Sequence, residues 1–276
     1  MAHQHRVEPA APARAAVRAS NPGWLPGDVE AKALALTRFS AEAVLAVLLT
    51  GCGSKPRVGE VRTESQSVEL GDAQSVQVWI NLGAGDLEVT GGAEKLFEAD
   101  FTYNVAKLKP DVNYTDGTLV LSQPENEGLP VLRDITDFRN EWALRLNDQV
   151  PMDLRVEIGA GASELRLAGL SLTGLNITLG AGGSMIDLSG DWARDLSVTV
   201  NAGAGDITVR LPGDVGARVR VNAGMGTIEA PDLEQNENIY TNAAYGESEN
   251  TLEIDIDAGV GQINLEVDDP STTETE

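Results

Sequence analysis

The sequence predicts an all-β protein and, more narrowly, a single parallel β-solenoid. The first observation is a motif of alternating apolar residues followed by Gly-x-Gly, which recurs along the chain. The second is its spacing, because the first glycines of the motifs from Gly159 to Gly224 are 21, 23 and 21 residues apart. The third is composition: aromatic residues are 4% and glycines number 29. Such a chain must bury small and branched aliphatic side chains on a tightly turning backbone.

Each motif supplies two short strands joined by a corner. Apolar residues alternate with a period of two on both sides of the glycines, which is typical of strands. The Gly-x-Gly step allows positive φ angles and leaves room for the backbone of a neighbouring coil. We expect coils of roughly 21 residues, stacked about 4.8 Å apart. The predicted corner residues are Gly83, Gly85, Gly159, Gly161, Gly180, Gly182, Gly203, Gly205, Gly224, Gly226, Gly259 and Gly261.

Two other folds share parts of this pattern. Leu167-x-x-Leu170-x-Leu172-x-x-Leu175 imitates a leucine-rich repeat, but Leu175 stands where that repeat has its ladder asparagine. No unit contains a helical half either. Antiparallel hairpins closed by glycine-containing loops would give a sandwich. The near-equal spacing of similar corners favours the solenoid.

The pattern lapses in two places and defines the expected boundaries. Residues 92–150 hold Phe97, Phe101, Tyr103, Tyr114 and Trp142, and we expect their strands to form a cap on the first coil. Residues 231–250 are a polar excursion before the last coil. The expected segments are a signal peptide with an over-extended N-terminus (1–51), a tether (52–74), an N-terminal region with the aromatic insertion (75–155), repeat coils of the same solenoid (156–267) and a disordered acidic tail (268–276).

A short apolar run over residues 43–50 leads into Leu49-Thr50-Gly51-Cys52, which matches the bacterial lipobox. In this interpretation Cys52 is acylated, and signal peptidase recognises Leu49, Thr50 and Gly51. The alternative is a buried structural cysteine. The lipobox predicts a protein anchored to the cell membrane by lipid on its extracytoplasmic side. In a diderm host, Gly53 in place of an aspartate would favour the outer membrane.

Charge and residue counts exclude several kinds of function. The formal net charge is -23, which argues against nucleic acid as a partner. Both histidines lie within the first five residues, and Cys52 is the single cysteine. We therefore expect no catalytic triad, zinc site, cofactor or catalytic residue. A glycan-active enzyme that uses carboxylates is the remaining enzymatic alternative.

Two sets of polar residues near the corners have alternative interpretations. Asp86 and Asp206 follow Gly-Ala-Gly, and we expect structural turn carboxylates there, with weak surface Ca²⁺ binding as the alternative. A second set precedes the corner in four units, and we expect a ladder of side chains that join coil to coil. A glycan-binding stripe is the alternative, against which the lack of an accompanying aromatic platform argues. The second set consists of Asn81, Asn201, Asn222 and Asp257.

The region from about Ser75 to Val267 resembles the bacterial toast-rack domain. It is also similar to the adhesin-like solenoid domains of cell-wall-active antibiotic response proteins. The motifs that carry the resemblance are Asn140-x-Trp142, Leu144-x-Leu146, Val150-Pro151 and Leu154 leading into Gly159-x-Gly161.

The resemblance implies a toast-rack type of solenoid without established catalytic residues. Some members of the family join it to a four-helix membrane segment and tune envelope-stress signalling. In this sequence we find no transmembrane helices, only the expected lipid anchor.

The expected function is therefore that of a non-catalytic, lipid-anchored envelope protein. It would act as a structural or protein-interaction module that modulates envelope-stress signalling. Its expected partners are the membrane, through acylated Cys52, and an envelope protein of unknown identity. An adhesin or glycan-binding surface protein is the alternative.

Overall fold

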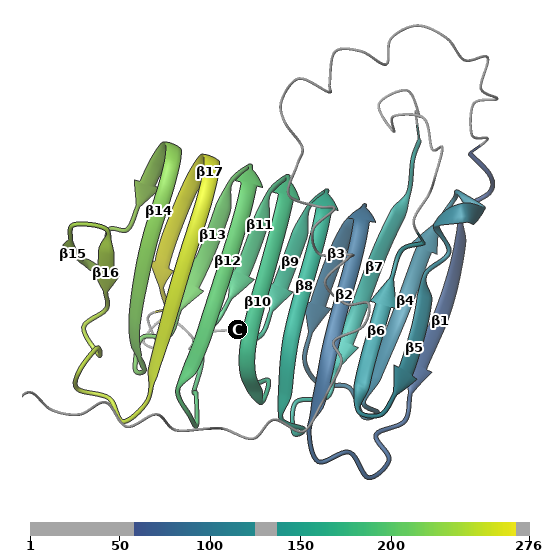
Figure 1. Ribbon diagram of the computed structural model, residues 1–276, viewed down its shortest axis with the longest axis horizontal. Helices are drawn as coiled ribbons and strands as arrows, with labels where there is room; N and C mark the ends of the chain where they lie inside the picture. Colours follow the sequence, from purple (N-terminus) through teal and green to yellow (C-terminus); the bar gives the residue numbers. More distant parts are fainter. Residues whose placement is uncertain (1–57, 125–136, 269–276) are drawn as a thin grey trace, which may run out of the picture. The chain divides into compact units, whose positions relative to one another are not determined.

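A computed structural model describes residues 58–124 and 137–268, and these residues form β-structure almost throughout (Figure 1). In these ranges the one helical element is the short 3-10 helix η2, Ala106–Leu108. The strands are β1 Arg62–Val68, β2 Val76–Ala84, β3 Asp86–Thr90, β4 Phe97–Tyr103, β5 Asp111–Thr115, β6 Thr118–Ser122, β7 Asn140–Leu146, β8 Met152–Ala160, β9 Ser163–Arg166, β10 Leu172–Ala181, β11 Ser184–Asp187, β12 Leu196–Ala204, β13 Ile207–Leu211, β14 Gly216–Glu229, β15 Glu234–Asn236, β16 Ile239–Thr241 and β17 Thr251–Val267.

The strands pair into two mainly parallel ladders of one sheet. In the first ladder the order is β6, β2, β8, β10, β12, β17 and β14. In the second ladder the order is β7, β3, β9, β11, β13 and β17, and the C-terminal part of β14 pairs with β17 there. The prediction of an all-β protein with a large parallel sheet is confirmed.

The chain passes from one ladder to the other at the Gly-x-Gly steps. β2 ends at Ala84 and β3 begins at Asp86, and β8–β9, β10–β11 and β12–β13 follow the same plan. β14 and β17 have no break at this point, so each contributes to both ladders as one long strand. The strands before and after each step therefore belong to different ladders, and their buried side chains point into the same core.

The core lies between the two ladders and follows the period-two alternation of the strands. In β2 the buried residues are Val76, Val78, Ile80 and Leu82, and the residues between them are exposed. Equivalent positions of β8, β10 and β12 are also buried leucine, isoleucine and valine, apart from the buried Met152 on β8 and the partly buried Ala202 on β12. The low aromatic content is consistent with this core, because branched aliphatic side chains pack well between closely spaced strands.

The aromatic residues of the insertion lie beside the first coil. β4 and β7 extend the second ladder next to β3, and β5 and β6 extend the first next to β2. Phe101 and Trp142 pack edge to face there, with ring centroids 5.3 Å apart. β1 pairs antiparallel with β4, so part of the segment expected as a tether is instead a strand of the sheet.

The unit that comes last in the sequence is not last in space. β17 lies between β12 and β14 in the first ladder, so Gly203 neighbours Gly259 rather than Gly224. Charge explains part of this order. Arg218 of β14 pairs with Glu253 of β17 at 2.8 Å, and Arg220 pairs with Asp255 at 2.7 Å. At the equivalent positions β12 has the uncharged residues Ser197 and Thr199, which could not form ion pairs with the arginines of β14.

Candidate interaction surfaces

The corner of the sheet is a column of glycine pairs in close backbone contact. At Gly182, φ is +138°, and a Cβ atom would lie 1.8 Å from the carbonyl oxygen of Gly161. The neighbouring strands repeat this contact, because a Cβ at Gly161 would lie 1.7 Å from the Gly85 oxygen. Only glycine allows this approach. The same overlap would occur at Gly159, Gly180, Gly203, Gly205, Gly224, Gly226, Gly259 and Gly261.

Amide side chains cover the N-terminal end of this column. The backbone N–H of Ala84 donates to Gln123 Oε1 at 3.1 Å, and Asn140 Nδ2 donates to the Ala84 carbonyl at 2.6 Å. Trp142 Nε1 in turn donates to Asn140 Oδ1 at 3.1 Å. These bonds satisfy peptide groups of the first corner and hold the indole of the cap in place. The Asn140-x-Trp142 spacing was the sequence signal for this arrangement, although it did not reveal the bonds.

The two aspartates beyond the corners serve the backbone. Asp86 Oδ1 accepts a hydrogen bond from the N–H of Ala162 at 3.1 Å, and Asp206 Oδ1 accepts one from Gln262 at 3.0 Å. In both cases the carboxylate joins its own strand to the next one. Within residues 58–124 and 137–268 no group of three or more His, Cys, Asp and Glu side chains is placed to hold a metal ion. The role that the structure shows for Asp86 and Asp206 is these two hydrogen bonds to backbone N–H groups.

The exposed side chains of β2, β8, β10, β12, β17 and β14 form one polar face of the first ladder. Asn201, Asp257 and Asn222 occupy aligned positions on three neighbouring strands of this face. Asn222 Nδ2 donates to Asp257 Oδ1 at 2.9 Å, so one step of the expected ladder is a side-chain hydrogen bond. Asn81 lies in the same row, but Glu157 and Thr178 separate it from Asn201.

A hollow of about 420 Å³ lies in the polar face beside the corner, and we call it the amide groove. It contains the aligned amides and the carboxylate, together with small residues of the corner. Its lining residues are Thr178, Leu179, Asn201, Ala202, Gly203, Asn222, Asp257, Ala258 and Gly259.

An aromatic side chain also belongs to the polar face. Trp79 is 43% exposed and lies on β2, between the exposed residues Gln77 and Asn81. The Arg155 guanidinium of the adjacent strand β8 lies 6.0 Å from the centre of its ring. Trp79 was not among the residues predicted from the sequence. The signal was present, because alternation in Val76–Asn81 gives Trp79 the same side as Gln77 and Asn81.

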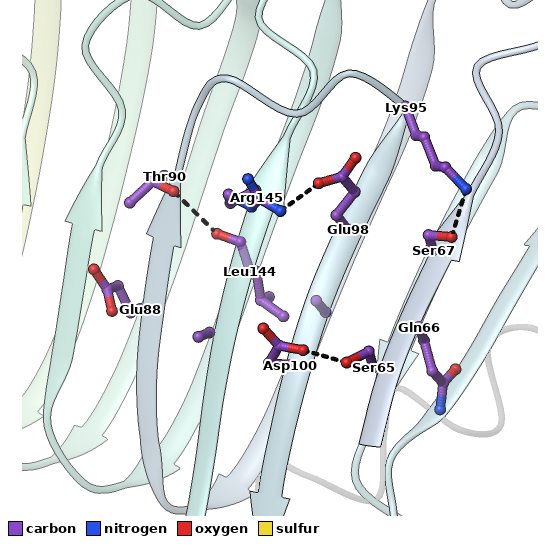
Figure 2. Close-up of a pocket in the computed structure, with 12 residues that line it drawn as sticks. Ser65, Gln66, Ser67, Glu88, Thr90, Lys95, Glu98, Asp100, Leu144 and Arg145 are labelled. Carbon is purple, nitrogen blue, oxygen red and sulfur yellow. Dashed lines mark hydrogen bonds and ion pairs between the residues drawn. The ribbon is translucent and has the colours of Figure 1, made fainter. Parts of the chain in front are cut away.

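A second hollow, of about 520 Å³, lies over β1, β3, β4 and β7 (Figure 2). Its charged groups have protein partners: Arg145 pairs with Glu98, Lys95 Nζ lies 3.1 Å from Ser67 Oγ, and Ser65 donates to Asp100. Lys95 also pairs with Glu69 at 2.6 Å, and this contact raises the pKa of the lysine. These carboxylates therefore act as partners for neighbouring side chains.

A buried tyrosine joins β4 to β1 close by. The hydroxyl of Tyr103 donates to Glu64 at 2.6 Å, and Lys109 Nζ lies 2.7 Å from the same carboxylate. The bonds from Lys109 and Tyr103 lower the pKa of Glu64. Burial, together with the bond to Glu64, raises the pKa of Tyr103 to about 12. The cluster of Tyr103, Glu64 and Lys109 therefore holds the edge strand β1 against β4.

The predicted lipidation residues Leu49, Thr50, Gly51 and Cys52 lie outside the described residues. Among the residues that are described, no helix is long and apolar enough to cross a membrane.

A family match and one solved structure agree with this architecture. The N-terminal domain of toast_rack, DUF2154, matches residues 57–210. A solved structure of a candidate cell adhesion protein from Clostridium sporogenes is 31% identical, with a TM-score of 0.71, and the match covers 76% of this chain and 100% of the other. A candidate adhesin from Bacteroides fragilis is 13% identical over 77% of this chain and 100% of its own, with a TM-score of 0.29. A search of curated proteins found no match. The chain belongs to the toast-rack domain family.

Proposed function

We propose that the protein is a non-catalytic interaction module of the bacterial cell surface, of the adhesin type. The observation that carries this proposal is the 31% identity and matching fold of the candidate cell adhesion protein from Clostridium sporogenes. Several side-chain contacts support it. In the hollow over β1, β3, β4 and β7, Arg145, Lys95, Glu98 and Asp100 are bound to neighbouring side chains, and Asp86 and Asp206 bind backbone N–H groups. Such groups hold a rigid display surface in place.

We further propose that each Gly-x-Gly unit is one coil of a solenoid, of roughly 21 residues. The register supports this interpretation, because Ala160 pairs with Ala181 and Ala181 pairs with Ala204. A stack of coils presents flat faces whose area grows with each unit, which suits recognition of an extended partner.

The proposed location is the extracytoplasmic side of the cell membrane, with lipid attached at Cys52. Leu49, Thr50 and Gly51 would form the peptidase recognition sequence before it. A net charge of -23 would repel the protein body from anionic lipid, so the exposed faces would stand clear of the membrane.

Two measurements test this proposal. Cys52→Ala is expected to abolish labelling by radioactive palmitate and to move the protein from the membrane fraction to the soluble fraction. Cells that carry the wild-type chain are expected to aggregate and to attach to wells coated with purified cell walls. Cells that carry Cys52→Ala should do neither. Equal attachment by cells with and without the chain would contradict the adhesin function, and a labelled Cys52→Ala variant would contradict the anchor.

A further inference from the structure

We propose that the polar face binds an extended, uncharged glycan, whose chain crosses the strands from Trp79 towards the amide groove. This inference rests on the proposed surface function and names its ligand class. The sequence alone argued against a glycan stripe, because no aromatic platform accompanied the asparagines. The structure supplies that platform on the same face.

Trp79 is an apolar platform in polar surroundings. Of the tryptophans in the described ranges, Trp142 and Trp192 are buried, whereas Trp79 is 43% exposed. It lies on the regular strand β2, which is paired on both sides, so the backbone that carries it is fixed. The apolar face of a sugar ring stacks on such an indole, while the hydroxyl groups at its edge remain free to bond.

Hydrogen-bonding groups follow Trp79 across the sheet. Arg155 is its neighbour on β8, and Asn176 is the neighbour of Arg155 on β10. Among the described residues Arg155 has no ion-pair partner, so its N–H donors are available beside the ring. Asn176 is exposed and offers both a donor and an acceptor. A sugar stacked on Trp79 would meet both side chains with its hydroxyl groups.

The amide groove lies at the other end of the face, in a parallel row two residues further along each strand. The row of Trp79 continues to Thr199, whereas the row of the groove begins at Asn81. Thr178 and Asn201 are aligned on β10 and β12, and Asp257 and Asn222 follow on β17 and β14. Parallel strands are about 4.8 Å apart, so the face offers one polar side chain per strand at that interval. This interval is similar to the length of one sugar unit in an extended glycan. The side chain of Asn201 makes no hydrogen bond within the described part of the chain, so it is free to bind.

The charge of the face selects an uncharged ligand. Asp153 and Glu157 flank Arg155 on β8, and Glu253, Asp255 and Asp257 follow one another on β17. Glu253 and Asp255 are paired with Arg218 and Arg220, so Asp153, Glu157 and Asp257, together with the net charge of -23, are the groups that would repel a polyanionic polymer. They can still accept hydrogen bonds from neutral hydroxyl and acetamido groups.

Titration of the full chain with chitohexaose and cellohexaose tests the site, with polygalacturonate as an anionic comparison. Heat of binding and tryptophan fluorescence are the two readouts, since Trp79 is the exposed indole in the described ranges. We expect binding of a neutral hexasaccharide, a loss of at least about tenfold in affinity for Trp79→Ala, and partial retention in Trp79→Phe. Asn201→Ala should lose about threefold. Met225→Ala removes an exposed apolar side chain away from Trp79 and should bind like wild type.

Failure of the site and failure of the proposed function give different results. Absence of binding to both neutral hexasaccharides, undiminished binding by a folded Trp79→Ala, or stronger binding of polygalacturonate would each overturn the glycan site. If cells that carry the wild-type chain still attach and aggregate in that case, the surface function stands with another ligand. If the hexasaccharides bind but cells gain no attachment, the site stands and the adhesin function falls. Circular dichroism of each variant separates loss of binding from loss of fold.

Discussion

The glycine pairs show how strongly single residues can constrain this backbone. Gly182 and Gly183 are adjacent in the chain, but their surroundings differ. A Cβ atom on Gly182 would overlap the carbonyl oxygen of Gly161, whereas a Cβ on Gly183 would meet nothing within 4 Å. Close approach of the two backbones therefore requires glycine at position 182, whereas position 183 has room for a side chain.

A matched pair of variants measures this difference. Gly182→Ala combines a backbone clash with positive φ, and we expect it to lower the free energy of unfolding by roughly 2–5 kcal/mol. Gly183→Ala should change it by less than about 0.5 kcal/mol. Urea denaturation monitored by circular dichroism gives both values. Equal effects of the two substitutions would show that the strands can move apart at the corner.

Because of Tyr103, the stability of the folded state should depend on pH in the alkaline range. Its pKa is raised from 10.0 to about 12, first by burial and then by the bond to Glu64, so the folded state favours the neutral phenol. This contribution is fully present below pH 10, and it is lost as the pH rises towards about 12. We expect Tm to fall more steeply between these values in wild type than in Tyr103→Phe.

Thermal melts in steps across that range check this expectation, with Tyr245→Phe as the control because Tyr245 is an exposed tyrosine. If Tm falls with pH at the same slope in wild type and in Tyr103→Phe, folding does not raise the pKa of Tyr103.

At the scale of the element, β17 has an unusual place for a strand near the end of a chain. It pairs with β12 and β13 on one side and with β14 on the other, so both of its edges are used along most of its length. By contrast, residues 222–229 of β14 pair with β17 and with no other strand in the described ranges.

Backbone hydrogen exchange should differ between β17, which is paired on both edges, and residues 222–229 of β14, which are paired on one. We expect the amides of β17 to be among the slowest to exchange, with protection close to the global free energy of unfolding. Amides of β14 beyond residue 222 that face away from β17 should exchange much faster. Mass spectrometry of peptides from both strands measures this. Rapid exchange over Leu252–Ile256 would contradict the central position of β17.

At the scale of the whole molecule, the large net negative charge destabilises the folded state. A net charge of -23 creates self-repulsion that the surface ion pairs offset only weakly, since exposed pairs contribute about 0–1 kcal/mol each. Salt screens this repulsion. We therefore expect Tm to rise by several degrees between low ionic strength and about 0.5 M NaCl.

Calorimetric scans over a series of NaCl concentrations check this prediction, and a matching KCl series excludes an effect specific to sodium. A Tm that falls with added salt would show that the cross-strand ion pairs, such as Arg218–Glu253, outweigh the repulsion.

The sequence by itself determined the features that depend on neighbouring residues. Period-two alternation identified the strands and their buried sides, as in Val76–Leu82, and the Gly-x-Gly steps marked the places where β2 gives way to β3 and β8 to β9. Both signals are local, because side-chain direction and φ are set within a few residues.

Tertiary structure alone decided which strands are neighbours and which exposed residues share a surface. Regular spacing could not place β17 inside the stack, because pairing between parallel strands depends on contacts far apart in the sequence, such as Arg220 with Asp255. The same holds for the polar face. Trp79 and Asn201 are distant in the chain, and only the register through β8 and β10 brings them onto one surface.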